Sequence, residues 1–143
     1  MHRIAAGRLE RGEHAHDAFV RLAKEPLREF LAQVRAADEA ACISLCLWGE
    51  TASNYRRHTL TPAMRYVFAT GDGSVRLTAI YSTVRFDTRP RTADVYAIHG
   101  RGLTLINELS TARWWFGGGE LHLRMDIGPA VSSAAGPSGD AHA

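Results

Sequence analysis

The spacing of hydrophobic residues predicts helices in the first part of the chain. Four apolar residues after Pro26 form one stripe about two helical turns long: Leu27, Phe30, Leu31 and Val34. Upstream, Asp17 is placed to cap a separate helix that carries Phe19. Pro26 suits the first position of a new helix because the missing amide hydrogen has no helical partner there. Two consecutive helices are therefore expected, divided at Pro26.

A continuous apolar run at residues 41–48 predicts a buried strand that ends at Gly49. A continued helix is the alternative, because periodicity cannot separate the two in so short a run. The strand would hold the Cα atoms of Cys42 and Cys46 about 13 Å apart, too far for a disulfide bond. Both cysteines are therefore expected to be small buried core residues. The polar residues 50–62 predict a loop or a short helical turn.

Three glycine turns predict antiparallel hairpins in the second half. They lie at residues 71–73, 100–102 and 117–119, and glycine allows the positive φ angles of tight turns. The expected strand pairs are 64–70 with 74–86, 95–99 with 103–106, and 112–116 with 120–127. The last strand alternates, with Leu121, Leu123, Met125 and Ile127 on one face and Glu120, His122, Arg124 and Asp126 on the other. Adjacent Trp114 and Trp115 must point to opposite faces.

The 143 residues suffice for one domain with one hydrophobic core. Polar residues 1–14 predict a flexible lead-in, residues 15–128 a single α+β domain, and the Ala-, Ser-, Gly- and Pro-rich residues 129–143 a disordered tail. The expected fold packs N-terminal helices on a strongly bent, cone-like antiparallel sheet of about six strands. A closed antiparallel β-barrel with an N-terminal helix is the alternative. No apolar run resembles a membrane span or a secretory signal, so a cytoplasmic location away from membranes is expected.

Residues 116–121, Phe-Gly-Gly-Gly-Glu-Leu, followed by Arg124 and Asp126, resemble the Phe-x-Asp-Gly-Lys-Ile turn and last strand of the NTF2-like or SnoaL-like α+β family. Residues 64–77 resemble the strand, Asp-Gly and strand segment of the same family. The turn lacks the usual Asp, and residues 41–48 are more apolar than the matching region. The resemblance implies a cone-shaped pocket closed by the N-terminal helices, and dimers formed through the outer face of the sheet.

The resemblance also implies a catalytic candidate. In the polyketide-cyclase branch of the family an Asp near the end of the last strand acts as acid or base, and Asp126 occupies the matching position. His122 lies on the same polar face and is the second acid–base candidate. The side chains expected to line the pocket are Tyr66, Tyr81, Trp114 and Arg124. For Asp126 the alternative is a solvated carboxylate paired with Arg124 or Arg113.

Charge adds a nucleic-acid alternative. The formal net charge is +2, but residues 56–91 hold seven arginines against two aspartates. A barrel with exposed aromatics could bind a nucleic-acid strand through Arg56, Arg57, Arg85, Arg89 and Arg91. A solvated arginine surface is the plainer interpretation. His58, His99 and His122 share no short metal-ligand spacing, so neither a metal nor a cofactor is expected.

These features predict a small cytoplasmic module that forms homodimers. It would bind a protein partner, or an apolar or aromatic small molecule in a pocket between helices and sheet. The first alternative is a cofactor-independent isomerase, cyclase or dehydratase with Asp126 and His122 as acid and base. The second is the nucleic-acid-binding barrel. The sequence contains no nucleophile elbow and no phosphate loop that would favour another class.

Overall fold

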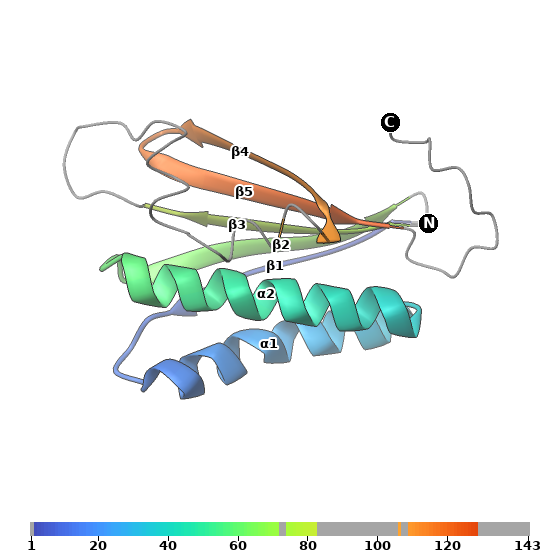
Figure 1. Ribbon diagram of the computed structural model, residues 1–143, viewed down its shortest axis with the longest axis horizontal. Coiled ribbons are helices and arrows are strands. Elements are labelled where there is room, and N and C mark those ends of the chain that lie inside the picture. Colours follow the sequence, from blue (N-terminus) through green and yellow to red (C-terminus); the bar gives the residue numbers. More distant parts are fainter. Residues whose placement is uncertain (1, 72–73, 83–105, 107–108, 129–143) are drawn as a thin grey trace.

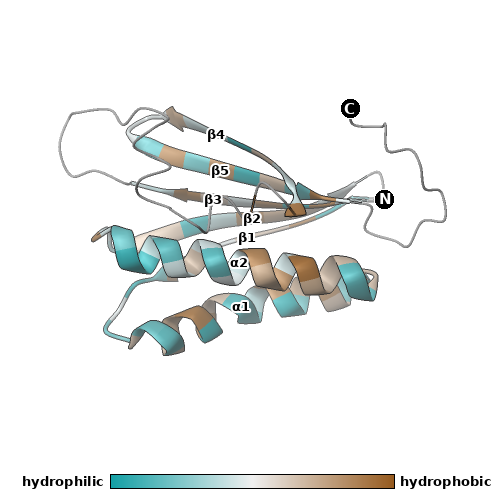
Figure 2. Ribbon diagram, viewed as in Figure 1, coloured by the Kyte–Doolittle hydropathy of each residue, from teal (hydrophilic) through white to brown (hydrophobic). Residues whose placement is uncertain are grey.

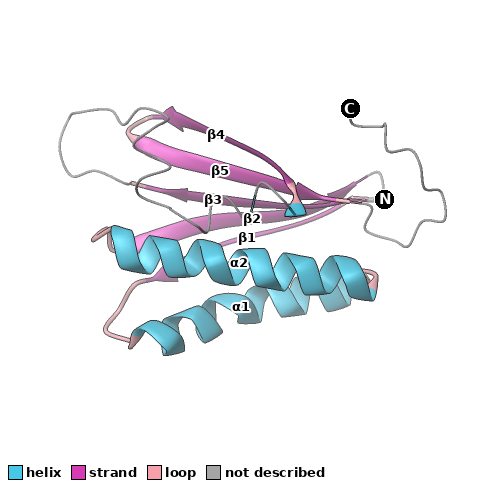
Figure 3. Ribbon diagram, viewed as in Figure 1, coloured by secondary structure: helices cyan, strands magenta, loops and turns pink. Residues whose placement is uncertain are grey.

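The computed structural model describes residues 2–71, 74–82, 106 and 109–128. These residues form a sheet and a layer of two helices beside it (Figures 1 and 3). The strands are β1 (Arg3–Glu10), β2 (Ala63–Gly71), β3 (Ser74–Tyr81), β4 (Thr111–Gly117) and β5 (Glu120–Ile127). The helices, α1 (His16–Gln33) and α2 (Asp38–His58), both lie between β1 and β2 in the chain.

The sheet has the strand order β1-β2-β3-β5-β4, and every neighbouring pair is antiparallel. The predicted α+β class, with helices packed on an antiparallel sheet, is confirmed. The closed barrel is wrong for the described strands, because β1 and β4 form opposite edges and do not pair with each other. The strand count also differs, since the described residues form five strands where about six were expected.

Two of the three predicted hairpins are confirmed as far as the residues are described, although residues 83–86 of the predicted strand 74–86 lie outside that range. β2 pairs with β3, and β4 pairs with β5. Gly118 and Gly119 connect β4 to β5 with φ angles of 61° and 80°, which lie in the left-handed region that a two-residue hairpin turn requires and glycine adopts without strain. The hairpin predicted around residues 100–102 lies outside the described residues except for Ile106, which is helical and not part of a strand as predicted. The tail predicted at 129–143 also lies outside them.

The N-terminal segment is an edge strand, so the prediction of a flexible lead-in is wrong for Arg3–Glu10. β1 pairs with β2 along its whole length. Its side chains on the helix side are small or only partly buried, namely Ala5, Gly7 and Leu9. A Cβ atom on Gly7 would collide with the Tyr66 ring, so glycine permits this close approach. Small residues and a glycine weaken the hydrophobic alternation that identifies a strand.

α1 is one continuous helix through Pro26, whereas the sequence predicted a break there. Asp17 lies in its first turn and makes no side-chain cap. Ala23 and Leu27, on either side of Pro26, are both fully buried. Burial on both sides of the proline therefore outweighs the hydrogen bond that proline cannot donate.

α2 contains both the apolar run 41–48 and most of the polar stretch predicted as a loop. The strand prediction for 41–48 is wrong, and the helical alternative is confirmed. Figure 2 shows the same division of α2, with hydrophobic residues mainly in its N-terminal half and hydrophilic residues mainly in its C-terminal half. Gly49 lies within α2 and does not end a strand, and the end of the Lys24 side chain of α1 packs over it, since a Cβ atom on Gly49 would lie 2.6 Å from Cε of Lys24.

The prediction that both cysteines are buried core residues is wrong, as is the strand at 41–48 on which it depended. Cys42 and Cys46 lie one helical turn apart on α2, and both are exposed free thiols. A helix turns through 3.6 residues, so a stretch that is apolar all round must expose part of its surface unless other elements enclose it. Ser44 and Leu47 occupy the buried side instead.

The core joins both helices to the sheet around Trp48. This side chain is fully buried and donates from Nε1 to the Ala23 carbonyl oxygen of α1 at 2.9 Å. Its ring meets the Phe68 ring of β2 edge-on, with centroids 5.0 Å apart. Trp48 therefore links three elements. Neither described helix is long and apolar enough to cross a lipid bilayer.

Candidate functional site

One side of the sheet packs against the helices and the other does not. Alternate residues of β3 and β5 on the helix side are buried, namely Val75, Leu77, Ala79, Tyr81, Leu121, Leu123, Met125 and Ile127. The register places the alternate residues of all five strands on the opposite side, here called the outer face: Ile4, Ala6, Arg8, Glu10, Ala63, Arg65, Val67, Ala69, Gly71, Ser74, Arg76, Thr78, Ile80, Thr111, Arg113, Trp115, Gly117, Glu120, His122, Arg124 and Asp126. No described helix covers the outer face (Figure 1).

The six predicted site residues are divided between these two sides. Tyr66, Tyr81 and Trp114 lie on the helix side. His122, Arg124 and Asp126 lie on the outer face. The sheet backbone separates the two groups, so the structure does not bring the acid–base candidates and the aromatic candidates into one pocket. Strand geometry explains this division, because residues separated by an odd number of positions point to opposite faces. His122 and Asp126 are an odd number of positions from Leu121 and Leu123, which face the helices.

Asp126 belongs to a cluster of ion pairs on the outer face. Arg76 of β3 donates from Nε to Oδ1 of Asp126 at 2.8 Å, and Arg124 donates from Nε to Oδ2 at 3.2 Å. The predicted pairing with Arg124 is confirmed, and Arg76, which lies opposite Asp126 in the register, is its other partner. Because both carboxylate oxygens already accept hydrogen bonds from guanidinium groups, this carboxylate balances charge rather than offering a free base.

His122 stacks on Trp115 of the neighbouring strand. The ring centroids are 5.1 Å apart and the planes differ by 9°. Trp115 remains 42% exposed, whereas Trp114 faces the helices, so the prediction that the two tryptophans point oppositely is confirmed. His122 and Asp126 are four residues apart in one strand, which separates their Cα atoms by about 13 Å. They therefore do not form an acid–base pair that acts on one atom.

Arginines outnumber carboxylates on the outer face. Arg8 pairs with Glu10 at 2.6 Å, and Arg65 pairs with Glu120 at 2.5 Å. Arg76 and Arg124 share the single carboxylate of Asp126. Arg113 lies opposite Arg124 in the register and forms no ion pair with a described residue. Every carboxylate of this face is thus already paired, and the surplus charge is positive.

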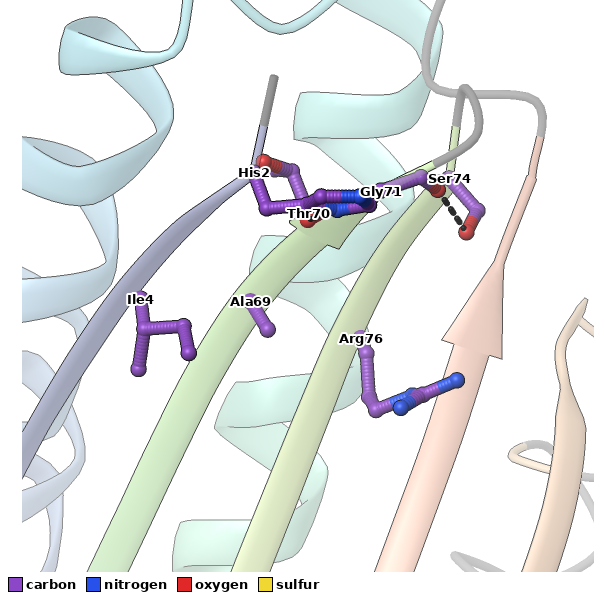
Figure 4. A pocket seen from close by; sticks show the side chains of 7 residues that line it. All are labelled: His2, Ile4, Ala69, Thr70, Gly71, Ser74 and Arg76. Atoms are coloured by element: carbon purple, nitrogen blue, oxygen red, sulfur yellow. Dashed lines mark hydrogen bonds between the residues drawn. The ribbon is translucent and has the colours of Figure 1, made fainter.

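A shallow depression of about 320 Å³ lies at one end of the outer face (Figure 4). Figure 4 shows Ile4, Ala69 and Arg76 on one side of the sheet, with the helices behind it. Ile4 is 71% exposed, the largest exposure of the bulky apolar residues described. His2 Nδ1 lies 3.0 Å from the Thr70 carbonyl oxygen at the rim. An apolar side chain and a guanidinium group therefore border one hollow.

The helix side holds buried phenols rather than an acid–base pair. Burial raises the pKa of Tyr81 well above its ordinary value, and neighbouring Tyr55 raises it further. Burial also raises the pKa of Tyr66, and Glu29 adds to that effect. A phenol whose pKa is raised stays protonated at neutral pH and cannot act as a base there. On α2, Ser44 Oγ and Asn54 Nδ2 are buried without a hydrogen-bond partner among the described residues.

The residues of the nucleic-acid alternative do not form one described surface. Arg56 donates from Nη2 to the His14 carbonyl oxygen at 2.9 Å and so holds the segment before α1 to the end of α2. Arg57 is exposed at the end of α2, and Arg85, Arg89 and Arg91 lie outside the described residues. The barrel that this alternative required is replaced by an open sheet.

The histidines of the sequence prediction are also separated. His58 ends α2, His122 lies on the outer face, and His99 lies outside the described residues. Partial burial lowers the pKa of His58, and the adjacent positive charge of Arg57 lowers it further. Within the described ranges no three metal-ligating side chains gather.

The sequence interpretation missed the contribution of β1 to the outer face. Ile4 and Arg8 lie there only because β1 joins the sheet edge. The available signal was weak, because only Leu9 alternates with polar neighbours, whereas Ala5 and Gly7 are small and flank the apolar Ala6. No protein-family model matches this chain, and no curated protein matches it.

Proposed function

We propose that this protein is an interaction module that binds another protein through the outer face of its sheet. The observation that carries this proposal is the exposed Trp115, which stacks on His122 in a face of mixed apolar and charged residues. Trp is enriched where proteins bind each other, because a rigid ring buries much area at little entropic cost. Ile4, at the other edge strand, supplies a second exposed apolar side chain.

The division of the predicted site residues supports the same proposal. A catalytic site requires the reacting groups to converge, and here Asp126 is held by two arginines about 13 Å from His122. A binding surface requires a broad face with apolar anchors and polar surroundings instead. The outer face combines Trp115 and Ile4 with a field of arginines and carboxylates.

The test compares proteins retained by the wild-type chain and by an Ile4→Ser/Trp115→Ser double variant. Leu60→Ser is the matched control, because Leu60 is 66% exposed and lies between α2 and β2, off the outer face. We expect at least one protein retained by wild type and control to be lost with the double variant, and to bind the purified wild type directly. Identical retention by all three chains would refute the proposal.

A second candidate function is small-molecule binding on the helix side of the sheet. The observation that favours it is Asn54, only 3% exposed, whose Nδ2 donor has no described partner. A buried unsatisfied donor costs about 1–3 kcal/mol, which a bound ligand with a carbonyl or carboxylate acceptor would recover.

Asn54→Leu tests this second candidate. A small aromatic or aliphatic acid that raises the melting temperature of the wild type but not of the variant would support it. Equal shifts in both proteins, or none in the wild type, would remove it. Arg28→Leu on the exposed side of α1 controls for nonspecific ligand effects.

A further inference from the structure

We infer that the partner bound by the outer face is an acidic protein segment with apolar side chains among its carboxylates. This inference rests on the proposed function and specifies the chemistry of the partner. It starts from the charge balance, in which five arginines and three carboxylates share the face. All three carboxylates are already in ion pairs with arginines of the same face.

The surplus positive charge is concentrated on neighbouring strands. Arg76 and Arg124 share the one carboxylate of Asp126, and Arg113 lies directly opposite Arg124 without a described acidic partner. Adjacent like charges across two strands repel each other. A carboxylate from a partner placed between Arg113 and Arg124 would relieve this repulsion and could accept paired hydrogen bonds from a guanidinium fork.

The same strands place apolar anchors beside the arginines. Trp115 lies two residues beyond Arg113 on the same side of β4, since alternate residues share a face. Arg76 and Ile4 border the depression at the other edge of the sheet (Figure 4). A segment that crosses the face would therefore meet an apolar and a cationic contact at each end. Acidic residues alternating with large apolar ones fit both ends.

Charge complementarity disfavours the two other occupants. A second copy of the chain would bring two outer faces together, each with the same excess of arginine, and the like charges would oppose association. A nucleic-acid strand carries a negative charge at every nucleotide, and its phosphates would pass the carboxylates Glu10, Glu120 and Asp126 on this face. A peptide can place its few carboxylates at the arginines alone.

The experiment measures fluorescence anisotropy of a labelled peptide in which glutamate and aspartate alternate with leucine and phenylalanine. Its comparison probes are the same peptide with glutamine and asparagine in place of the acids, and a single-stranded oligouridine. We expect the acidic peptide to bind the wild type, to bind more weakly as salt is raised, and to bind better than either comparison probe.

Arg113→Glu is the diagnostic variant, because Arg113 has no described ion pair whose loss would affect folding. We expect it to weaken peptide binding about fivefold or more, the scale of one exposed charge pair changed in sign. Arg28→Glu, on the exposed side of α1, is the matched control and should leave binding unchanged. Circular dichroism confirms that both variants are folded.

Three results would overturn the inference. Tighter binding of oligouridine, with the same dependence on Arg113, would identify a nucleic-acid surface. Self-association lost with the Ile4→Ser/Trp115→Ser variant and insensitive to salt would identify a second copy as the partner while leaving the proposed function intact. Absence of charge-dependent peptide binding would refute the acidic partner, and the retention experiment above would then decide separately whether the outer face binds protein at all.

Discussion

Replacing Trp48 by phenylalanine tests the account of the core most directly. Trp48 is fully buried and holds α1, α2 and β2 together through one hydrogen bond and two ring contacts. Phenylalanine keeps a ring at this position but removes the Nε1 donor and part of the ring volume. The substitution therefore separates the contribution of the indole from that of a buried aromatic side chain in general.

The expected loss of stability is the sum of two terms. Removing the hydrogen bond to the Ala23 carbonyl oxygen costs about 1 kcal/mol, the usual net value for a buried pair. The lost ring atoms and the cavity they leave cost about 2 kcal/mol, below the full range for tryptophan replaced by alanine. The free energy of unfolding should fall by about 3 kcal/mol, which for a chain of this size lowers the melting temperature by about 10 °C.

Urea denaturation followed by circular dichroism measures this loss, with the slope against urea expected to stay unchanged. Trp115→Phe is the matched control, because the same chemical change at a 42% exposed side chain should alter the unfolding free energy by less than about 0.5 kcal/mol. A decrease in unfolding free energy below about 1 kcal/mol for Trp48→Phe, or equal decreases for both variants, would refute the conclusion that Trp48 links α1, α2 and β2.

Three further predictions follow from the described residues. Asp126→Asn should change the unfolding free energy by no more than about 1 kcal/mol, because the ion pairs of Asp126 are partly exposed. The same variant should bind the acidic peptide more tightly. Loss of the fold in this variant would contradict the small stability change. Burial raises the pKa of Tyr81, so on raising the pH the phenol loses its proton in the unfolded state before it does so in the folded state. The free energy of unfolding should therefore decline above about pH 10, the ordinary pKa of tyrosine. Tyr81→Phe should make that decline shallower in urea titrations. Cys42 and Cys46 should both react with a thiol reagent in the folded protein as fast as in urea, whereas protected thiols would contradict their exposure on α2.

The sequence was most informative where local geometry alone decides the structure. The Gly117–Gly119 turn and the alternation of residues 120–127 were sufficient to predict β4, β5 and their pairing. Positive φ angles at Gly118 and Gly119 need no distant contact, and a two-residue turn fixes the register of its strands. The opposite orientation of Trp114 and Trp115 followed from the same geometry.

The failures came where distant packing decides the local structure. Residues 41–48 are apolar except for Ser44, so the sequence offered no hydrophobic period by which to separate helix from strand. The buried side of α2 continues through Thr51 and Asn54, which are polar and therefore concealed the helical pattern. α1 likewise runs through Pro26 because α2 and the sheet bury the residues around it.

The sequence by itself determined that Glu120, His122, Arg124 and Asp126 share one face of a strand, because successive side chains in a strand point to opposite sides. Only the tertiary structure decided that this face is the outer one. The helices cover the side of the sheet that carries the apolar residues, since burying that side removes the most apolar surface from water. Strand order then placed Arg76 beside Asp126, a contact between residues 50 positions apart in the chain.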